Sequence, residues 1–473
     1  MADQAARKAG ASDDAATEAA APETAAAETA APETAAAQAA SDEAVRFTSD
    51  LIRIDTTNRG GGDGRERPAA EYVAQQLSDA GLDSVLLERA PGRANVICRV
   101  PGTNPGAPAL LVHGHLDVVP ADPERWSVHP FSGEVRDGVI WGRGAVDMKN
   151  ADAMLLAVVR SWARAGLSPG RDLVLAFTAD EEDTAHYGAA WLADHHGALF
   201  EGCTEAVGES GAFTFHAGPG LRVYPVGSAE RGTAWLKLTA RGRSGHGSKP
   251  NGENAVYRLA EAVTRIGAYR WPVRLTATVR AALAALAGVT GVRADLDDPG
   301  LDIDDLLRRL GPAAELVEAT VRNSANPTML RAGDKVNVIP GAAAAYVDGR
   351  VLSGYEDEFR RALDELTGPD VSWEYAHREV PLEAPWDAPL VGAMTAALLA
   401  EDPGAHVVPY CMGGGTDAKH FSRLGIAGYG FTPLRLPPGY DYYAMFHGVD
   451  ERVPVEAVGF GVRVLHRFLL SAG

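Results

Sequence analysis

The stretch ALLVHGHLDVVP, residues 109–120, decides the fold class that this sequence predicts. Its apolar run LLV is typical of a strand that is buried within a sheet. The run leads into His113, His115 and Asp117, which recur at every second position. In an extended chain this spacing aims all three side chains to one side, and a carboxylate two residues from a histidine can orient the imidazole for a metal ion. The alternative is a pair of histidines bonded to backbone at a strand end.

Strand-like runs alternate with amphipathic helical patterns on both sides of this stretch. The expected elements are helices from Ser41 and over 68–81, strands over 84–87, 95–100, 109–113 and 172–178, and a helix over 149–165. Such alternation predicts an α/β fold in which helices cover a largely parallel or mixed sheet. After residue 388 the same kind of pattern returns, so the first domain resumes there.

A separate α+β unit is predicted between residues 229 and 378. Its expected elements are strands over 233–240, 342–351 and 371–375, and helices over 254–266 and 356–366. Residues 281–326 are rich in leucine, alanine and aspartate with helical periodicity, and are expected to insert two helices into this unit. The main domain is therefore predicted to consist of residues 41–228 and 379–473.

The first 40 residues differ from the rest in composition. They contain a near repeat, APETAAAETA followed by APETAAAQAA, and no large apolar residue after Met1. Such a segment cannot build a core, and Pro22 and Pro32 interrupt any helix. We predict a disordered tail over residues 1–40.

Composition excludes several classes of function. The formal net charge of -19 would repel phosphate backbones, so nucleic acid is not expected as a partner. Cys98, Cys203 and Cys411 are widely spaced, which argues against a disulfide framework or a thiolate zinc site and favours a reducing cytoplasm. No apolar run reaches the roughly 18 residues that a membrane helix needs, and no signal-peptide core is found.

Acidic side chains follow three further apolar or glycine-rich segments. Asp147 lies at the start of the predicted helix after WGRGAV, where it could also be only an N-cap. The run LVLAFTA leads to Asp180, Glu181 and Glu182, and a shorter run leads to Glu209. Because carboxylates this close repel one another, a shared cation accounts for them.

Taken together, the motifs closely resemble the M20 metallopeptidase family, which includes desuccinylases, acetylornithine deacetylase, aminoacylases and glutamate-releasing carboxypeptidases. The segments that carry the resemblance are HGHLDVVP, GRGAVDMKN, TADEE, GES, GRSGHGSKP, NVIPG, GGGTDAK and the late His447. It covers essentially everything after the tail. The resemblance implies a three-layer, zinc-exopeptidase-like α/β catalytic domain with an inserted α+β, ferredoxin-like lid or dimerisation domain.

A centre of two divalent metal ions is the second implication of the resemblance. His115, Asp147 and Glu209 match the ligands of one ion, while Asp147, Glu182 and His447 match those of the other, so that Asp147 bridges. The family also commonly has a cis peptide after the bridging aspartate. Nitrogen and oxygen ligands without thiolates suit zinc, with cobalt or manganese as replacements.

The resemblance also implies residue roles in catalysis and substrate binding. Glu181 matches the general base, Asp117 the acid that orients His115, and His246 a histidine that polarises the substrate carbonyl, often from the partner subunit. His113 has no assigned role. The positions that match substrate contacts are Asn337, Arg350, Gly414 and Thr416, although turns use several of these residue types anyway.

These features predict a hydrolase that uses metal-activated water to cleave the amide bond of a C-terminal or N-acyl amino acid. Glutamate at Glu209 favours this carboxypeptidase or deacylase type over aminopeptidase-like members, which often carry aspartate there. Alternatives are a dipeptidase, a desuccinylase and a non-catalytic metal-binding scaffold. An amidohydrolase barrel would need eight strand-helix repeats, which are not found. A homodimer is expected, and the enlarged lid leaves a monomer as the alternative.

Overall fold

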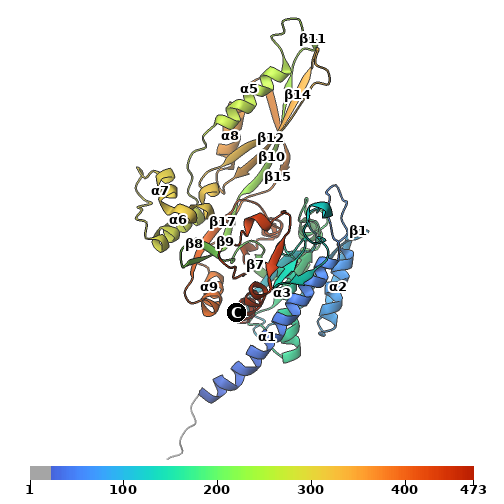
Figure 1. Cartoon of the computed structure of the whole chain (residues 1–473), viewed down its shortest axis with the longest axis vertical. Coiled ribbons are helices and arrows are strands. Elements are labelled where there is room, and N and C mark those ends of the chain that lie inside the picture. The colour runs from blue at the N-terminus through green and yellow to red at the C-terminus, as the bar shows by residue number, and fades with distance from the viewer. Residues whose placement is uncertain (1–22, 473) are drawn as a thin grey trace, which may run out of the picture.

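The computed structural model describes residues 23–472, which form a ten-stranded large sheet and a separate four-stranded small sheet (Figure 1). The large sheet has the order β1-β2-β6-β3-β7-β18-β9-β16, and β8 and β17 also pair with β9. Its strands are β1 Ser84–Ala90, β2 Arg93–Val100, β3 Ala109–His115, β6 Leu173–Thr178, β7 Cys203–Gly208, β8 Phe215–Gly218, β9 Leu221–Glu230, β16 Leu382–Glu383, β17 His406–Met412 and β18 Ala427–Gly430. Strands β6, β3, β7 and β18 run parallel. The predicted mixed α/β fold is confirmed. Because the sheet is open, with β1 and β16 at its two edges, the amidohydrolase barrel is ruled out.

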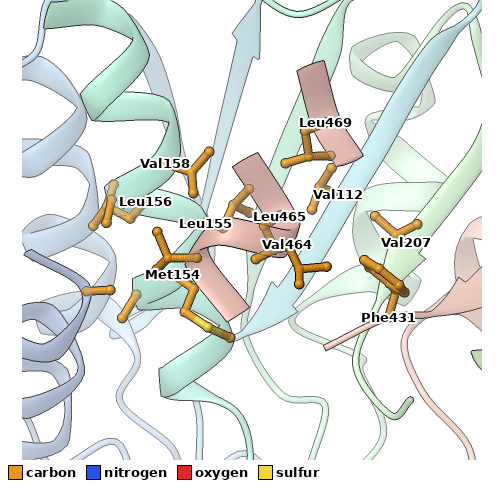
Figure 2. Close-up of a cluster of buried hydrophobic side chains, with 14 of the residues drawn as sticks. Val112, Met154, Leu155, Leu156, Val158, Val207, Phe431, Val464, Leu465 and Leu469 are labelled. Carbon is orange, nitrogen blue, oxygen red and sulfur yellow. The ribbon is translucent and has the colours of Figure 1, made fainter. Parts of the chain in front are cut away.

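Helices cover both faces of the large sheet. One hydrophobic cluster joins Val112 of β3 and Val207 of β7 to apolar side chains of five helices, as the close-up in Figure 2 shows for α3 and α11. These helices are α1 Glu23–Arg53, α2 Arg67–Ser78, α3 Lys149–Ala165, α9 Pro389–Glu401 and α11 Val455–Ser471. On the other face a second cluster joins Leu111 of β3 to α4 Ala189–His195 and α10 Ala418–Phe421. The domain therefore has three layers, and β3, with all seven residues buried, lies at its centre.

Helix α3 has the bounds that its sequence predicts. It begins at Lys149, two residues after Asp147, and ends before Gly166, which adopts a left-handed conformation with φ 68° and caps the helix through its N–H to Trp162 O. Glycine is favoured there because a Cβ is strained at positive φ. Since the buried face of α3 packs against the centre of the large sheet, the start of the helix is fixed near the end of β3.

The small sheet has the order β12-β14-β10-β15 and projects away from the large sheet (Figure 1). Its elements are β10 Gly232–Arg241, α5 Ala255–Ala268, β12 Ser324–Ala332, β14 Ala342–Val351, α8 Glu356–Thr367 and β15 Val371–Arg378. Helices α5 and α8 share one hydrophobic cluster with the inner side chains of the sheet. This order of strands and helices is the ferredoxin-like arrangement. A two-stranded ribbon, β11 Gly245–His246 with β13 Val338–Ile339, lies at its far tip.

The helices expected within residues 281–326 pack differently from the prediction. They are α6 Ala277–Thr290 and α7 Ile303–Leu310, followed by the 3-10 segment η3 Gly311–Leu316. Their apolar side chains share a cluster with Val223 of β9 and Val408 of β17, both in the large sheet. The insertion therefore extends the core of the main domain, whereas the prediction attached it to the lid.

Helix α1 begins earlier than the sequence suggests. The prediction placed a disordered tail over residues 1–40, of which residues 1–22 lie outside the described part of the chain. The rest belongs to α1, and Ala37 and Ala40 are buried. The predicted start at Ser41 is therefore too late, because small alanine side chains suffice to pack this turn of the helix against the body. Among residues 23–472, no helix combines the length and apolar character needed to cross a membrane.

Candidate metal centre

The side chains that the family resemblance implies as metal ligands and general base lie together at one edge of the large sheet. Parallel strands β6, β3 and β7 are neighbours, so their carboxyl ends lie side by side. His115 is the last residue of β3, Glu181 and Glu182 follow β6, and Glu209 follows β7. Asp147 reaches the same edge from the turn before α3, which packs on these strands.

One half of the cluster surrounds His115. Its Nε2 atom lies 3.0 Å from Asp147 Oδ1, 3.7 Å from Glu209 Oε2 and 3.9 Å from Glu181 Oε2. The His115 side chain is only 1% exposed. Its other nitrogen, Nδ1, lies 2.9 Å from the main-chain oxygen of Asp117, which fixes the ring so that Nε2 faces the acids.

The other half surrounds His447, in the loop before β19 Arg452–Pro454. Its Nε2 atom lies 3.3 Å from Asp147 Oδ2 and 3.0 Å from Glu182 Oε2. Asp147 thus contacts His115 through one oxygen and His447 through the other. The peptide bond between Asp147 and Met148 is cis, as the family resemblance implies.

The pKa values of these groups reflect a site with too much negative charge for its burial. Burial, followed by repulsion from Glu209, raises the pKa of Glu181 well above its usual range. Burial and repulsion from Asp147 raise the pKa of Glu182 to about 7. Hydrogen bonds to Asp147 and Glu182 raise the pKa of His447 to about 10. Each raised pKa favours the protonated form of its group, because the side chains alone do not supply enough positive charge to balance the carboxylates.

The donor set fits divalent cations. Two groups, His115 with Asp147 and Glu182, and His115 with Glu181 and Glu209, place one ligand atom from each residue within 4.8 Å of the others. Buried Glu182 Oε1 has no hydrogen-bond partner among the described residues. Imidazole nitrogens and carboxylate oxygens without thiolates are ligands that suit zinc and similar metals.

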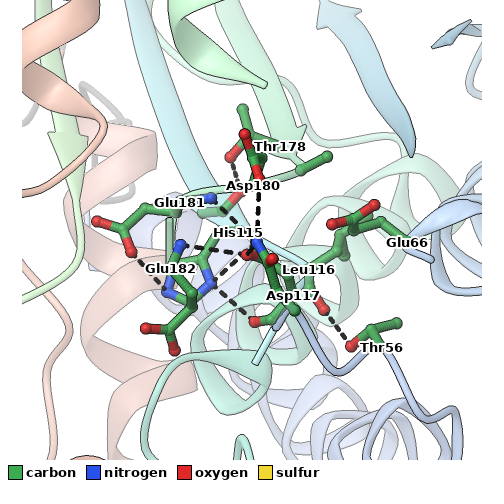
Figure 3. A network of polar contacts seen from close by, with 12 residues as sticks. Thr56, Glu66, His115, Leu116, Asp117, Thr178, Asp180, Glu181 and Glu182 are labelled. Carbon is green, nitrogen blue, oxygen red and sulfur yellow. Dashed lines mark hydrogen bonds and ion pairs between the residues drawn. The ribbon is translucent and has the colours of Figure 1, made fainter. Parts of the chain in front are cut away.

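Asp117 supports the site from behind (Figure 3). It is fully buried, and its two carboxylate oxygens accept hydrogen bonds from the main-chain N–H groups of Glu181 and Glu182, at 3.2 and 3.1 Å. Asp117 Oδ1 also lies 3.6 Å from His115 Nδ1. Asp117 therefore holds the segment of the two glutamates as well as the histidine.

A buried polar network extends from Asp117 through Asp180, and its other members, Asn58, Arg93 and Glu66, were not predicted from the sequence. The Asn58 side-chain amide donates to Asp117 Oδ2 at 2.9 Å and to Asp180 Oδ1 at 3.0 Å. Asp180, which has φ 69°, also accepts from Arg93, and Arg93 is paired with Glu66 by two bonds of 2.7 Å. A left-handed conformation in a residue other than glycine costs on the order of 1 kcal/mol and needs such support. Because these partners lie far apart in the sequence, no local pattern could reveal them.

His113, which had no assigned role, packs beneath the site. Its buried ring lies 5.3 Å from the ring of Phe421, and burial lowers its pKa to about 3. A Cβ on Gly208 would lie 2.3 Å from His113 Cε1, so the glycine before Glu209 leaves room for this ring. His113 therefore fills space between β3, β7 and α10.

Two of the predicted lid residues lie far from this cluster in their own chain. His246 and Asn337 are both exposed and lie at the tip of the small-sheet unit, where Gly247 N donates to Asn337 O at 2.9 Å. Figure 1 shows this tip separated from β7 by the whole length of that unit. The described chain does not bring His246 and Asn337 to the acids.

The remaining predicted contacts lie nearer the base of the small sheet or in the glycine loop. Arg350, near the end of β14, pairs with Asp348 at 2.7 Å and lies opposite Thr233, close to the start of β10, which follows β9 of the large sheet. Thr416 is buried and donates to Glu230 Oε1 at 2.7 Å, while Gly414 lies in the preceding turn between β17 and α10. Arg350 and Thr416 thus already have partners within the chain.

The amino-acid sequence is similar to one known family and to several known proteins. The sequence model described as peptidase family M20/M25/M40 matches residues 111–471. The N-fatty-acyl-amino acid synthase/hydrolase PM20D1 of Xenopus tropicalis is 26% identical over 83% of this chain and 78% of its own length. Aminoacylase-1 of Mus musculus is 27% identical over 85% of this chain and 89% of its own length.

Solved structures share the fold. A metallo-carboxypeptidase of the M20 family, Sso-CP2 from Sulfolobus solfataricus, superposes with a TM-score of 0.66 at 17% identity and covers 90% of this chain and 98% of its own. The dipeptidase Dug1p from Saccharomyces cerevisiae gives 0.65 at 16% identity, with 93% and 98% covered. A Bacillus subtilis protein, YXEP, described as a dinuclear metal-binding peptidase of the M20 family, gives 0.56 at 12% identity, with 92% and 99% covered.

Proposed function

Because the chain belongs to the peptidase family M20/M25/M40, whose members hydrolyse amide bonds, we propose that it releases an amino acid from an N-acyl amino acid at a two-metal centre. The observation that carries this proposal is the convergence of His115, Asp147, Glu182, Glu209 and His447 around a small space that also receives Glu181.

Each half of the cluster is proposed to hold one divalent ion, and zinc is the metal that we expect first. His115, Asp147 and Glu209 form one ligand set, and Asp147, Glu182 and His447 form the other, with Asp147 shared. Divalent ions bound there would polarise the amide carbonyl and lower the pKa of a water molecule.

Glu181 is the proposed general base. Its carboxylate lies beside His115 but farther from Nε2 than that of Asp147, and burial with repulsion from Glu209 favours its taking up a proton. Glu181 accepts the proton as the water oxygen attacks the carbonyl carbon, and passes it to the amine nitrogen as the C–N bond breaks. The products are a carboxylic acid and an amine, which at neutral pH become a carboxylate and an ammonium group. Asp117 keeps Glu181 in place through the main-chain bond described above.

The small-sheet unit is proposed to act as lid and dimerisation domain. His246 is exposed at the tip, so a partner subunit could bring its own His246 to the carbonyl oxygen of the substrate, with Asn337 beside it. Edge strand β12 carries Leu330, 65% exposed, and α5 carries Tyr257, 68% exposed. Such apolar side chains on an unpaired edge and an adjoining helix favour association of two copies.

Substrate selection is proposed to depend on a free carboxylate. The Arg350 guanidinium can offer two parallel N–H donors to it, in exchange for its present bond to Asp348. Gly414 and Thr416 would line the same part of the site. Two relatives that match over most of this chain are an N-fatty-acyl-amino acid synthase/hydrolase and an aminoacylase, which favours N-acyl amino acids over dipeptides as substrates. We place the reaction in the cytoplasm, since Cys98, Cys203 and Cys411 are buried free thiols.

A substrate panel tests the proposal directly. Protein loaded with zinc or cobalt is assayed against N-acetyl and N-long-chain-acyl amino acids, N-succinyl amines and dipeptides, each beside its carboxamide counterpart. The expected result is turnover of N-acyl amino acids that falls strongly when the free carboxylate is amidated. Turnover of dipeptides alone would favour the dipeptidase, and no turnover with any metal would favour a non-catalytic scaffold.

A further inference from the structure

A buried ion pair joins the two loops that carry Asp147 and His447. Arg143 Nη1 donates to Glu451 Oε2 at 2.7 Å, and the two side chains are 3% and 0% exposed. Arg143 lies four positions before Asp147, and Glu451 four positions after His447. The pair therefore connects the loops just outside the proposed ligands.

Glu451 also binds the main chain that leads to Asp147. Its Oε1 atom accepts from Val146 N at 2.7 Å and from Asp147 N at 3.0 Å, and Oε2 accepts from Gly144 N at 3.0 Å. A carboxylate that accepts several N–H groups from one turn fixes the backbone of that turn. Glu451 thus determines where the Asp147 side chain starts.

The second terminal nitrogen of Arg143 binds the loop that carries His447. Its Nη2 atom donates to Gly448 O at 2.9 Å, directly after His447. The guanidinium also lies 5.1 Å from the ring centre of Trp126, and Gly142 N donates to Glu451 O at 2.9 Å. Behind the pair, β19 runs antiparallel to β5 Val139–Trp141. These contacts hold the His447 loop against the Asp147 loop.

We propose that Arg143 and Glu451 are positioning residues that set the separation of Asp147 from His447, and through it the affinity for the ion held by His447. The inference rests on the two-metal centre proposed above, and neither residue contacts substrate in it. Three observations support it: the pair is buried, it binds backbone on both sides, and His447 is the most exposed proposed ligand, with 56% of its side chain accessible. Because a buried ion pair adds little net stability compared with apolar residues, its placement here indicates a role in geometry.

The pair should influence the two ions unequally. Of the two side chains, Arg143 is the one that binds Gly448, directly after His447, so its loss should weaken the ion that needs His447 and spare the ion held by His115, Asp147 and Glu209. Loss of the Glu451 carboxylate should loosen the bridging Asp147 as well, and so disturb both ions. Outer-shell partners of metal ligands typically change metal affinity by about 10- to 100-fold.

The test uses the full chain, stripped of metal and titrated with cobalt(II), with the visible spectrum and the unfolding midpoint as readouts. The variants are Glu451→Gln, Arg143→Lys and Arg143→Met, with His447→Ala as the reference for loss of one ion. Arg171→Met is the matched control, since Arg171 pairs with Glu205 at 2.8 Å and is 7% exposed. It lies just before the start of β6, at the end of that strand opposite to Glu181 and Glu182.

The expected result is a cobalt spectrum altered by Glu451→Gln, and a second cobalt equivalent bound about 10- to 100-fold more weakly by both Arg143 variants. Arg171→Met should lower the unfolding midpoint and leave the spectrum unchanged. Wild-type affinity for both equivalents in Arg143→Met and Glu451→Gln would overturn the inference, as would an equal change in Arg171→Met.

If Glu451→Gln fails to fold, the Arg143 variants decide. A wild-type chain that binds no cobalt would overturn the metal centre itself, while cobalt binding without turnover would overturn only the proposed reaction.

Discussion

His447 Nε2 lies 3.0 Å from Glu182 Oε2, although the two residues come from distant segments of the chain. Glu182 follows a central strand of the large sheet, whereas His447 lies in a loop near the C-terminus. Their contact needs the second segment of the main domain to fold back beside the first. The half of the cluster that contains His447 is thus the part that depends most on the complete chain.

His447→Ala should remove one metal equivalent and leave the other in place. His447 contacts Asp147 and Glu182, whereas Glu209 lies beside His115 in the other half, so that half keeps its own ligands. Metal analysis of dialysed protein checks this, and activity should fall at least about 100-fold. Because the side chain is half exposed, the unfolding midpoint of the metal-free chain should hardly change. Two retained ions would contradict the assignment.

Glu181→Gln should nearly abolish turnover while both metal equivalents remain bound. The amide cannot take the proton from water, and loss of a general base typically costs about 10²- to 10⁴-fold in rate. The change is nearly isosteric, so the main-chain bond from residue 181 to Asp117 should persist. Glu209→Gln serves as the comparison, since it should lower metal content as well as rate. Equal metal loss in both variants would identify Glu181 as a ligand.

Much of this arrangement could be predicted from local sequence. The helix over 149–165 and the strand over 342–351 have the predicted bounds, because apolar periodicity within each segment decides its structure. The acids at the ends of β6 and β7 were found because each follows an apolar run. Strand β9, with Gly227 and Pro225 inside it, was not expected, since its pairing depends on neighbours far along the chain.

The supporting residues could not be predicted for the same reason. Asn58, Arg93 and Glu451 carry no motif of their own, and each acquires its meaning from a partner on another segment. The packing of α6 against β9 and β17 likewise depends on which apolar face lies opposite, which periodicity does not specify. Sequence therefore indicates the ligands of the site more readily than the residues that hold them.

Asn58→Ala should lower the rate without unfolding the protein. The amide links Asp117 to Asp180, and its loss leaves Asp117 Oδ2 with one fewer donor beneath the glutamates. Support of this kind is typically worth about 10- to 100-fold in activity or metal affinity. Steady-state kinetics and a cobalt titration measure both. Asn95→Ala is a comparison within the same layer, since the Asn95 side chain bonds to main-chain atoms of Ala179, Leu87 and Tyr187. An equal loss in both variants would indicate general loosening of the layer.

Asp402→Asn should destabilise the chain at neutral pH more than in acid. Two bonds from Arg222, at 2.8 and 2.5 Å, and one from Tyr224 lower the pKa of Asp402 in the folded protein. An acid whose folded pKa is below its unfolded value of about 3.9 stabilises the fold above that pH, and this contribution is lost as the pH falls through the folded pKa. We expect about 1 kcal/mol at pH 7, since Arg222 is partly exposed. Urea unfolding of both proteins at about pH 7 and pH 3 measures the difference, and a constant difference would contradict the prediction.

Mixing two inactive variants should restore activity if His246 acts across subunits. In a mixed dimer of His246→Ala with Glu181→Ala, one site combines an intact Glu181 with the His246 of the other subunit, whereas neither parent dimer contains such a site. Random reassociation should therefore recover up to about a quarter of wild-type activity, since about half of the dimers are mixed and each has one complete site. The pair Glu181→Ala with His447→Ala is the control, because both residues belong to the same cluster within one chain and no mixed dimer can reunite them. Co-expression with two affinity tags isolates the mixed species for assay.

Full activity of His246→Ala alone would show that the exposed histidine at the tip takes no part in catalysis. An inactive mixture would show that His246 acts within its own chain.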